Sequence, residues 1–222
     1  MAERSAVPEN EFFEYARRRM VESQLRLRGI ADQRVLDAMG KVPRHVFVPK
    51  RYWHDAYDDH PLPIGEEQTI SQPYIVAIML ESLALKPGDK VLEVGTGSGY
   101  ATALLAELAG EVLSMERHQT LADEARRVLD ELGYRNVRIM AGDGSRGFPE
   151  SAPYDAILVS AGAYEVPHAL VEQLAEGGRL IIPVGHGDSQ QLQLIRMQNG
   201  QPQTTLRELC RFVPLVEGMG GE

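Results

Sequence analysis

The distribution of hydrophobic residues divides the chain into regions with different periodicity. From residue 89 onward, short runs rich in Val, Ile and Leu alternate with longer stretches in which hydrophobic residues recur at helical spacing. The runs predict strands at residues 90–94, 111–115, 137–141, 155–160 and 179–184, and the stretches predict helices at residues 100–108, 119–132 and 167–174. Strands that alternate with helices form parallel sheets covered on both faces, so this region predicts an α/β fold with a doubly wound sheet.

The periodicity changes after Gly187. Residues 191–197 alternate between polar and hydrophobic, Asn199 and Gly200 form a turn signal, and residues 208–215 return as a second strand. We therefore expect an antiparallel pair at the edge of a mostly parallel sheet.

The first third of the chain has helical and irregular patterns instead of strands. Residues 10–27 have helical composition, residues 32–39 place hydrophobic side chains on one helical face, and residues 73–83 form another helical pattern. Residues 61–67 predict an irregular connection because they contain two prolines and a glycine. We expect an N-terminal helical and loop extension of residues 1–66 and a main domain of residues 67–222, packed as one compact unit. The pattern assigns no role to residues 1–11.

Composition narrows the possible partners. The formal net charge of the 222 residues is -9, which opposes binding to nucleic acid.

No hydrophobic run approaches the ~20 residues that span a bilayer, and the N-terminus has no apolar signal core, so we expect a cytoplasmic protein without membrane contact. The six histidines show no metal-ligand spacing, and we expect no metal. Because the strand pattern exposes no apolar seam, we expect a monomer.

Three predicted strand ends carry candidate binding residues. The first strand runs into L-E-V-G-T-G-S-G-Y, where Gly95, Gly97 and Gly99 allow a tight turn before a helix. The second ends at Glu116, 21 positions after Gly95, about where an acid meets ribose hydroxyls in nucleotide-binding α/β units. The third ends at Asp143, between two glycines. Either acid alone is equally well explained as a turn residue, but the combination indicates a nucleotide-like ligand.

The spacing and charge of these strand ends favour one ligand class. The loop G-T-G-S-G brings its third glycine one residue earlier than the dinucleotide motif G-x-G-x-x-G. Glu93, Glu116 and Asp143 would collect negative charge, which suits a ligand with a cationic centre and opposes a pyrophosphate. S-adenosylmethionine combines adenosine with a sulfonium and an ammonium group, so the pattern favours a methyltransferase.

The stretch Q-T-I-S-Q-P, residues 68–73, places hydroxyl and amide groups just before a predicted helix. From the residue types alone, Ser71 is more simply explained as part of an N-terminal helix cap, with Pro73 in the first turn. A role in holding a substrate remains open at this point.

Together these stretches resemble the protein-L-isoaspartate (D-aspartate) O-methyltransferases of the bacterial type. The resemblance extends from Met20 to Gly218 and includes R-G-I-A-D-Q-R-V-L-D-A-M-G-K-V-P-R-H-V-F-V-P, T-I-S-Q-P, V-L-E-V-G-T-G-S-G-Y, M-E-R, G-D-G-S-R-G and R-F-V-P-L. T-I-S-Q-P is far more specific than the glycine loop, which class I methyltransferases share. The stretch V-S-A-G-A-Y-E-V-P departs from the more alanine-rich form expected, and the sequence ends soon after Gly218; either could alter substrate access.

The resemblance implies a class I, Rossmann-like fold, an S-adenosylmethionine cofactor and a set of site residues. It places the active-site serine at Ser71, with the Thr69 hydroxyl beside it. It implies that the remaining binding residues are Glu93, Gly95, Thr96, Gly97, Ser98, Gly99, Glu116, Arg117, Gly142, Asp143 and Gly144 for the cofactor, and Ile70, Ser71 and Val213 for the substrate.

The implied reaction is methyl transfer to the free α-carboxylate of isoaspartyl, and also D-aspartyl, residues in damaged proteins, which starts their repair through a succinimide. Two other classes remain open. A small-molecule or nucleic-acid methyltransferase would share residues 95–143, although the N/D-P-P-Y/F loop of a common amino-group type is missing. A non-catalytic binding module could keep the same fold.

Overall fold

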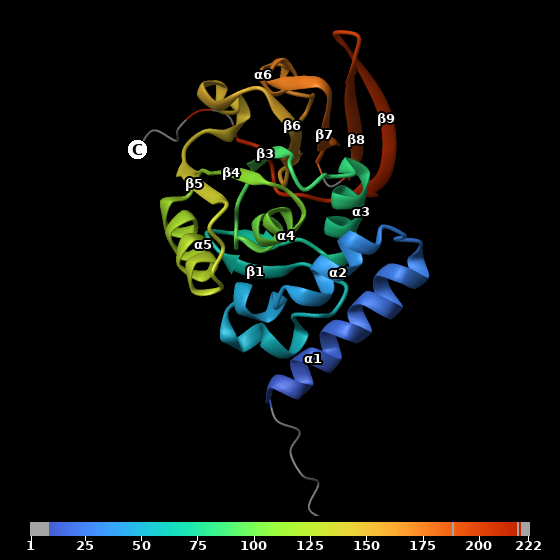
Figure 1. The fold of residues 1–222 in the computed structure, drawn as a ribbon. Helices are drawn as coiled ribbons and strands as arrows, with labels where there is room; N and C mark the ends of the chain where they lie inside the picture. Colours follow the sequence, from blue (N-terminus) through green and yellow to red (C-terminus); the bar gives the residue numbers. More distant parts are fainter. Residues whose placement is uncertain (1–8, 188, 217, 219–222) are drawn as a thin grey trace, which may run out of the picture.

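A seven-stranded sheet forms the centre of the molecule (Figure 1). The computed structural model describes residues 9–187, 189–216 and 218. In spatial order the strands are β5 (Val137–Ala141), β4 (Glu111–Glu116), β3 (Lys90–Val94), β6 (Tyr154–Val159), β7 (Leu174–His186), β8 (Ser189–Gln198) and β9 (Gln201–Cys210). Strands β5 to β7 in this order are parallel, and β8 and β9 are antiparallel, which confirms the predicted sheet and its edge.

Both faces of the sheet are covered, as predicted. Successive residues of a strand point to opposite faces, and the buried hydrophobic residues accordingly fall into two clusters. Val91 belongs to one cluster and Leu92 to the other. The larger cluster includes side chains of α3 (Pro73–Leu83), α4 (Tyr100–Leu108) and α5 (Gln119–Glu131), whereas the smaller one includes Leu170 of α6 (His168–Glu172).

Three predicted element boundaries are wrong. The helix expected at residues 167–174 is shortened to α6, because Leu174 already pairs with Tyr154 at the start of β7. Residues 61–67 are not irregular: β1 (Leu62–Gly65) pairs with β2 (Gln68–Ile70) in a hairpin whose turn has positive φ angles at residues 65–67. The last strand, β9, spans 201–210 instead of 208–215, since Asn199 and Gly200, both with positive φ, already reverse the chain.

The N-terminal segment packs directly against the sheet domain. It contains α1 (Glu9–Arg19), a π turn (Met20–Leu25), α2 (Gln33–Lys41) and 3-10 turns at Arg26–Arg28, Arg44–Phe47 and Lys50–Asp55. Its buried side chains, such as Leu36 and Met39, share one hydrophobic cluster with α3 and α4. The β1–β2 hairpin also crosses the expected boundary at residues 66 and 67. We therefore propose that the two segments fold as a single unit.

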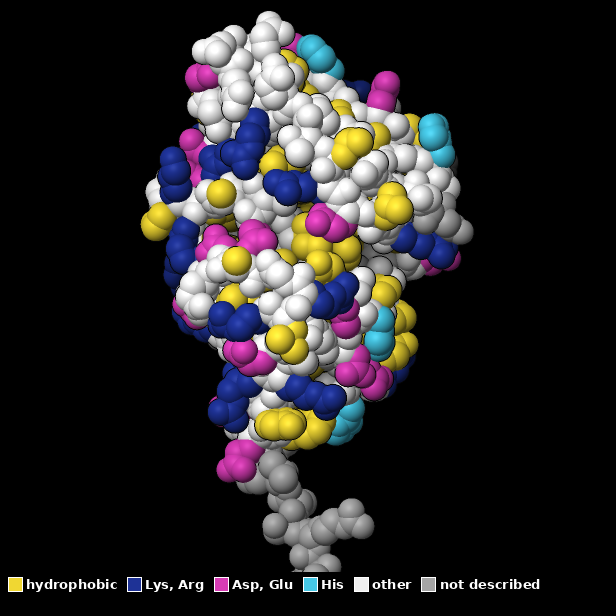
Figure 2. Space-filling view, turned by 90° about the vertical axis from the view of Figure 1, so that its right-hand side faces the viewer, with side chains coloured by type: hydrophobic (Ala, Val, Ile, Leu, Met, Phe, Trp, Pro, Cys, Tyr) yellow, Lys and Arg dark blue, Asp and Glu magenta, His cyan; other side chains and the backbone are white. Residues whose placement is uncertain are grey.

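The face of the molecule on the side of α3 and β9 carries hydrophobic and charged side chains together. On this face, hydrophobic, acidic and basic side chains alternate over short distances (Figure 2). In the described part of the chain, no helix is long and apolar enough to cross a membrane.

Candidate functional site

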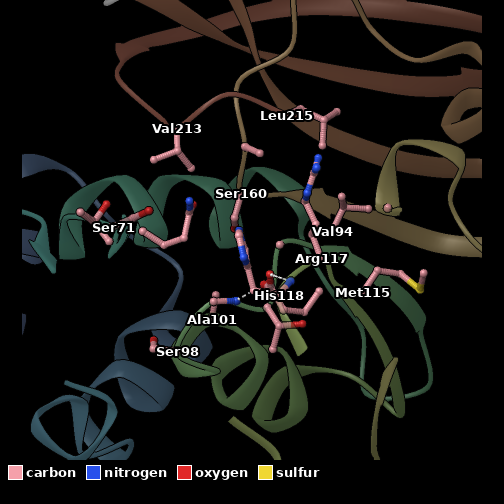
Figure 3. Close-up of a pocket in the computed structure, with 18 of the residues that line it drawn as sticks. Ser71, Val94, Ser98, Ala101, Met115, Arg117, His118, Ser160, Val213 and Leu215 are labelled. Carbon is pink, nitrogen blue, oxygen red and sulfur yellow. Dashed lines mark hydrogen bonds between the residues drawn. The ribbon is translucent and has the colours of Figure 1, made fainter. Parts of the chain in front are cut away.

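A cavity of about 370 Å³ lies beyond the carboxyl ends of β3, β4 and β6. This is where open α/β sheets hold their ligands, and the volume falls in the ordinary range for small-molecule pockets. In Figure 3, Ser71 lies on one side and Met115 on the other, with Val213 and Leu215 above and Ser98 and Ala101 below. The lining consists of residues 66–71, Val76, Met79, 94–98, 100, 101, 115–118, Gly142, Gly144, Leu158, Ser160, Ala161 and 213–216.

The glycine loop and Glu116 form the floor of this cavity. Gly95 and Gly97 have φ angles of 94° and 53°, in the left-handed region that glycine adopts without strain. The Gly97 N–H donates to Glu116 Oε2 (2.8 Å), and the His118 N–H donates to Glu116 Oε1 (2.9 Å). A carboxylate offers about four acceptor positions, so Glu116 can hold the loop and still accept further donors from a ligand.

Two segments from outside the parallel sheet close the cavity. The turn of the β1–β2 hairpin is tied to α5, because Thr120 Oγ1 donates to Glu66 Oε1 (2.7 Å). Residues 213–216, which we call the C-terminal strap, are fixed by two hydrogen bonds with Gly162, from its N–H to Val213 O (2.8 Å) and from Leu215 N–H to its carbonyl (2.7 Å). These segments give the cavity walls that the parallel strands alone do not provide.

The chemistry of the lining fits S-adenosylmethionine. The acidic residues Glu66, Glu67 and Glu116 line the cavity together with the basic residues Arg117 and His118. The apolar residues Val76, Met79 and Leu158 also line it. Acidic groups suit the cationic part of the cofactor, and apolar walls suit its adenine ring. Among the described residues, no group of three His, Cys, Asp or Glu side chains could hold a metal ion.

Glu93 is the first sequence-predicted site residue that the structure does not bring into the cavity. Its side chain is fully buried on the α4 face of the sheet, and Oε2 accepts hydrogen bonds from Thr102 Oγ1 (2.6 Å) and Ser114 Oγ (2.5 Å). Ser114 in turn contacts the hydroxyl of Thr96 in the glycine loop at 2.5 Å. Glu93 therefore supports the loop from behind, because alternation along β3 turns its side chain toward α4.

Burial raises the pKa of Glu93 to about 7, against the hydrogen bonds from Ser114 and Thr102, which lower it. The folded state therefore keeps a proton on this carboxyl between about pH 4.5, its ordinary pKa, and pH 7, where the unfolded chain has lost it. The contribution of Glu93 to the free energy of unfolding is complete below about pH 4.5 and declines as the pH rises toward 7.

The variant Glu93→Gln should remove this decline, because glutamine cannot ionise. Between pH 5 and pH 8, the stability of the variant relative to the native protein should rise by roughly 2 to 3 kcal/mol. Urea unfolding at a series of pH values measures this difference. Glu22→Gln, at a side chain that is 63% exposed, serves as the control, and parallel profiles for Glu93→Gln and the native protein would contradict the expectation.

Asp143 also lies outside the cavity. Its Oδ1 accepts from Ser145 N (2.9 Å) and Ser145 Oγ (2.6 Å), and its Oδ2 accepts from Gly218 N (2.8 Å). It borders a separate surface depression, whereas its neighbours Gly142 and Gly144 do line the cavity. In the structure the Asp143 carboxylate fixes a turn and the end of the described chain, and its role in cofactor binding stays a prediction. Gly99 likewise is not part of the lining, and it forms the N-terminal cap of α4.

Ser71 reaches the cavity and does not cap α3. The N-terminal cap residue is Gln72, whose side chain makes no capping hydrogen bond. The backbone N–H of Tyr74, in the first turn of α3, donates to Oδ1 of Asp59 (3.2 Å), a residue of the N-terminal segment. The capping explanation of Ser71 is therefore wrong. Thr69 and Ile70, both predicted, line the same wall, with Thr69 exposed and Ile70 buried.

Several lining residues were not predicted. Ser160 follows β6 at the same sheet edge as Gly95, so the strand-end argument could have included it. Glu66, Tyr100 and Leu215 carry no signal of their own in the sequence. They enter the cavity through the hairpin turn, the first turn of α4 and the strap, whose positions depend on tertiary packing.

Comparison with known proteins identifies a family. The model of the family described as "Protein-L-isoaspartate(D-aspartate) O-methyltransferase (PCMT)" matches residues 16–220. A protein-L-isoaspartate O-methyltransferase of Koribacter versatilis is 54% identical over 216 residues, covering 97% of each chain. One of Methanoculleus marisnigri is 53% identical over 205 residues, covering 92% of this chain and 93% of that protein. The crystal structure of a putative enzyme of this name from Plasmodium falciparum, in complex with S-adenosyl-L-homocysteine, is similar with a TM-score of 0.80 and 30% identity, over 91% of this chain and 99% of the other.

Proposed function

The chain belongs to the protein-L-isoaspartate(D-aspartate) O-methyltransferase family, and from this premise we propose how its residues carry out the reaction. The enzyme transfers a methyl group from S-adenosylmethionine to isoaspartyl residues of damaged proteins, which begins their repair. The observation that supports the proposed residue roles is the meeting of Ser71 and the glycine loop in one cavity.

The cofactor is held by the sheet side of the cavity in this proposal. The loop at residues 95–98 allows close approach of the backbone, and Glu116 accepts hydrogen bonds from the ribose hydroxyls through its remaining lone pairs. Arg117, Gly142 and Gly144 complete this wall. Bound there, S-adenosylmethionine would supply a methyl group on a positively charged sulfur: an ionised carboxylate oxygen would bond to the methyl carbon while the carbon–sulfur bond breaks and S-adenosylhomocysteine leaves.

The substrate carboxylate is held by the opposite wall. In an isoaspartyl residue the main chain runs through the side-chain carbonyl, which leaves the α-carboxylate free, and with a pKa near ~3.5 this group is ionised at pH 7. No strong base is needed, so the protein's task is to orient the carboxylate. The hydroxyls of Ser71 and Thr69 donate to it, while Ile70 and Val213 contact the neighbouring peptide. Such positioning can contribute roughly 7 to 11 kcal/mol to a reaction.

The function is tested by substrate selectivity. A normal aspartyl residue carries its carboxylate one bond further from the main chain, so a site that grips the backbone aligns only the isoaspartyl group. We expect labelled methyl from S-adenosylmethionine to enter an isoaspartyl peptide at least about tenfold faster than its aspartyl twin. The ester should then release methanol as the next backbone nitrogen closes a succinimide. Equal labelling of both peptides, or a stable ester on a glutamate side chain, would overturn the repair function.

Assembly and location remain proposals. We propose a cytoplasmic location. We propose a monomer because the edge strand β9 carries Arg207 and Glu208 between its exposed leucines, and charged side chains on an edge oppose pairing with another sheet. A molecular mass near 49 kDa, twice the 24.6 kDa of one chain, in light scattering at micromolar concentration would contradict the monomer.

A further inference from the structure

A fully buried arginine lies behind the wall that carries Ser71. Arg44 belongs to the 3-10 turn after Pro43 in the N-terminal segment, and its side chain has no solvent exposure. Its Nε donates to the carbonyl of Ala56 (2.7 Å) and its Nη2 donates to the carbonyl of Ser71 (2.8 Å). One guanidinium thus joins the N-terminal segment to Ser71, which lines the cavity.

The charge of Arg44 persists although it is buried. Burial lowers its pKa to about 10, which leaves the group positively charged at pH 7. Its hydrogen-bond partners are carbonyl oxygens instead of carboxylates, and a cation buried in this way costs free energy that a hydrophobic side chain of similar size would not. The buried charge of Arg44 is thus not explained by a gain in stability. We explain it by the two backbone carbonyls that its guanidinium holds, those of Ala56 and Ser71.

The same short segment is held from a second side. Asp59 Oδ1 accepts from the Tyr74 N–H (3.2 Å), and Asp59 Oδ2 accepts from Gln72 Nε2 (2.7 Å). The Arg44 cation thus binds the carbonyl of Ser71, and the Asp59 carboxylate binds donors of Gln72 and Tyr74. In addition, the Arg44 guanidinium lies 4.8 Å from the ring centre of Tyr100, which lines the cavity. The Ser71 carbonyl is therefore held directly by Arg44, while Asp59, also in the N-terminal segment, holds the residues that follow Ser71.

We propose that Arg44 is a positioning residue for methyl transfer, which acts by holding the Ser71 backbone so that its hydroxyl meets the substrate carboxylate. This inference rests on the proposed role of Ser71. It also gives the N-terminal segment a part in the reaction: the segment supplies the charged groups that fix the substrate wall, whereas the sheet domain supplies the cofactor wall.

The test is a double-mutant cycle of Arg44→Met and Ser71→Ala, followed by kcat/KM for an isoaspartyl peptide and by calorimetric Kd for S-adenosylhomocysteine. We expect Arg44→Met alone to lower kcat/KM about 10- to 30-fold. In the Ser71→Ala background the same change should cost less than about threefold, because the group that it positions is gone. The Kd for S-adenosylhomocysteine should change less than about threefold in every variant, a result that general damage to the fold would not give.

Two further variants keep the test decisive. Arg34→Met is the control: the guanidinium of Arg34, an exposed residue, also binds two backbone carbonyls, those of Leu85 and Leu108, but outside the cavity lining, so kcat/KM should be unchanged. Arg44→Lys keeps the charge without the planar pair of donors, and it carries the cycle if Arg44→Met does not fold. Its smaller loss should also disappear in the Ser71→Ala background.

The outcomes separate this inference from the role of Ser71 itself. If Ser71→Ala lowers kcat/KM and the double variant shows the product of the two single losses, the positioning role of Arg44 is overturned and the proposed role of Ser71 stands. A fully active Ser71→Ala protein would overturn both. Coupled losses with an unchanged cofactor Kd support the proposal.

Discussion

Replacing Ser71 by alanine should lower kcat/KM for an isoaspartyl peptide about 100-fold while leaving cofactor binding and thermal stability nearly unchanged. Ser71 lines the cavity and caps no helix, so under the proposed role the loss of its hydroxyl removes an orienting donor and little else. Misplacement of a reacting group by about 1 Å can cost a factor of this size. Initial rates, calorimetry with S-adenosylhomocysteine and thermal unfolding of one preparation measure the three quantities.

A true helix cap provides the control for this variant. Asp32 Oδ1 accepts from Arg34 N (2.9 Å) at the start of α2, far from the cavity lining. Asp32→Ala should lose about 1 kcal/mol of stability and keep its rate, the reverse of the result expected for Ser71→Ala. If Ser71→Ala instead lost stability and retained turnover, the proposed substrate wall would be wrong.

Replacing Glu116 by alanine should raise the Kd for S-adenosylmethionine about 100-fold. Glu116 is 5% exposed and lines the cavity, and its carboxylate accepts hydrogen bonds from the backbone N–H groups of Gly97 and His118. A hydrogen bond to a charged group contributes roughly 1.5 to 3 kcal/mol, and loss of the ribose contacts together with these backbone hydrogen bonds accounts for about 3 kcal/mol. Isothermal titration of the variant with the cofactor measures the change.

The control for Glu116 removes the same charge nearby. Asp123 lies on α5, where its exposed side chain binds Arg126, and Asp123→Ala should bind the cofactor normally. Glu116→Gln should fall between the two, because one of its two terminal atoms becomes a donor that faces a backbone N–H. An unchanged cofactor Kd in Glu116→Ala would contradict the placement of the cofactor on the sheet side of the cavity.

The five predicted parallel strands and most helices were correct because their signals are local. The alternation of hydrophobic runs fixed the five parallel strands, and Asn199 with Gly200 marked the turn between β8 and β9. The error at the end of α6 occurred where a distant segment competes for a residue: Leu174 joins β7 because Tyr154, 20 residues earlier in the chain, is available to pair with it.

The candidate site was only partly predictable for a related reason. The glycine loop and Glu116 follow strand ends, so the sequence places them at one edge of the sheet. Glu93 and Asp143 follow the same rule in sequence, yet the structure directs one carboxylate to Thr102 and Ser114 and the other to Ser145 and Gly218. A sequence motif shows that an acidic residue is present at a strand end. The direction of its side chain depends on which face of the sheet the residue points to and on the hydrogen-bond partners that lie there in the folded chain.

The sequence by itself determined the α/β class and the sheet edge at which the cavity lies, because these depend on periodicity and on residues adjacent in the chain, whereas Ser71 became a candidate site residue only through the family resemblance of T-I-S-Q-P. Only the tertiary structure decided that Ser71 faces the cavity instead of capping α3, and that Arg44, 27 residues earlier, holds its carbonyl. Contacts of this kind form when hydrophobic burial brings separate segments together, and burial is a property of the whole fold.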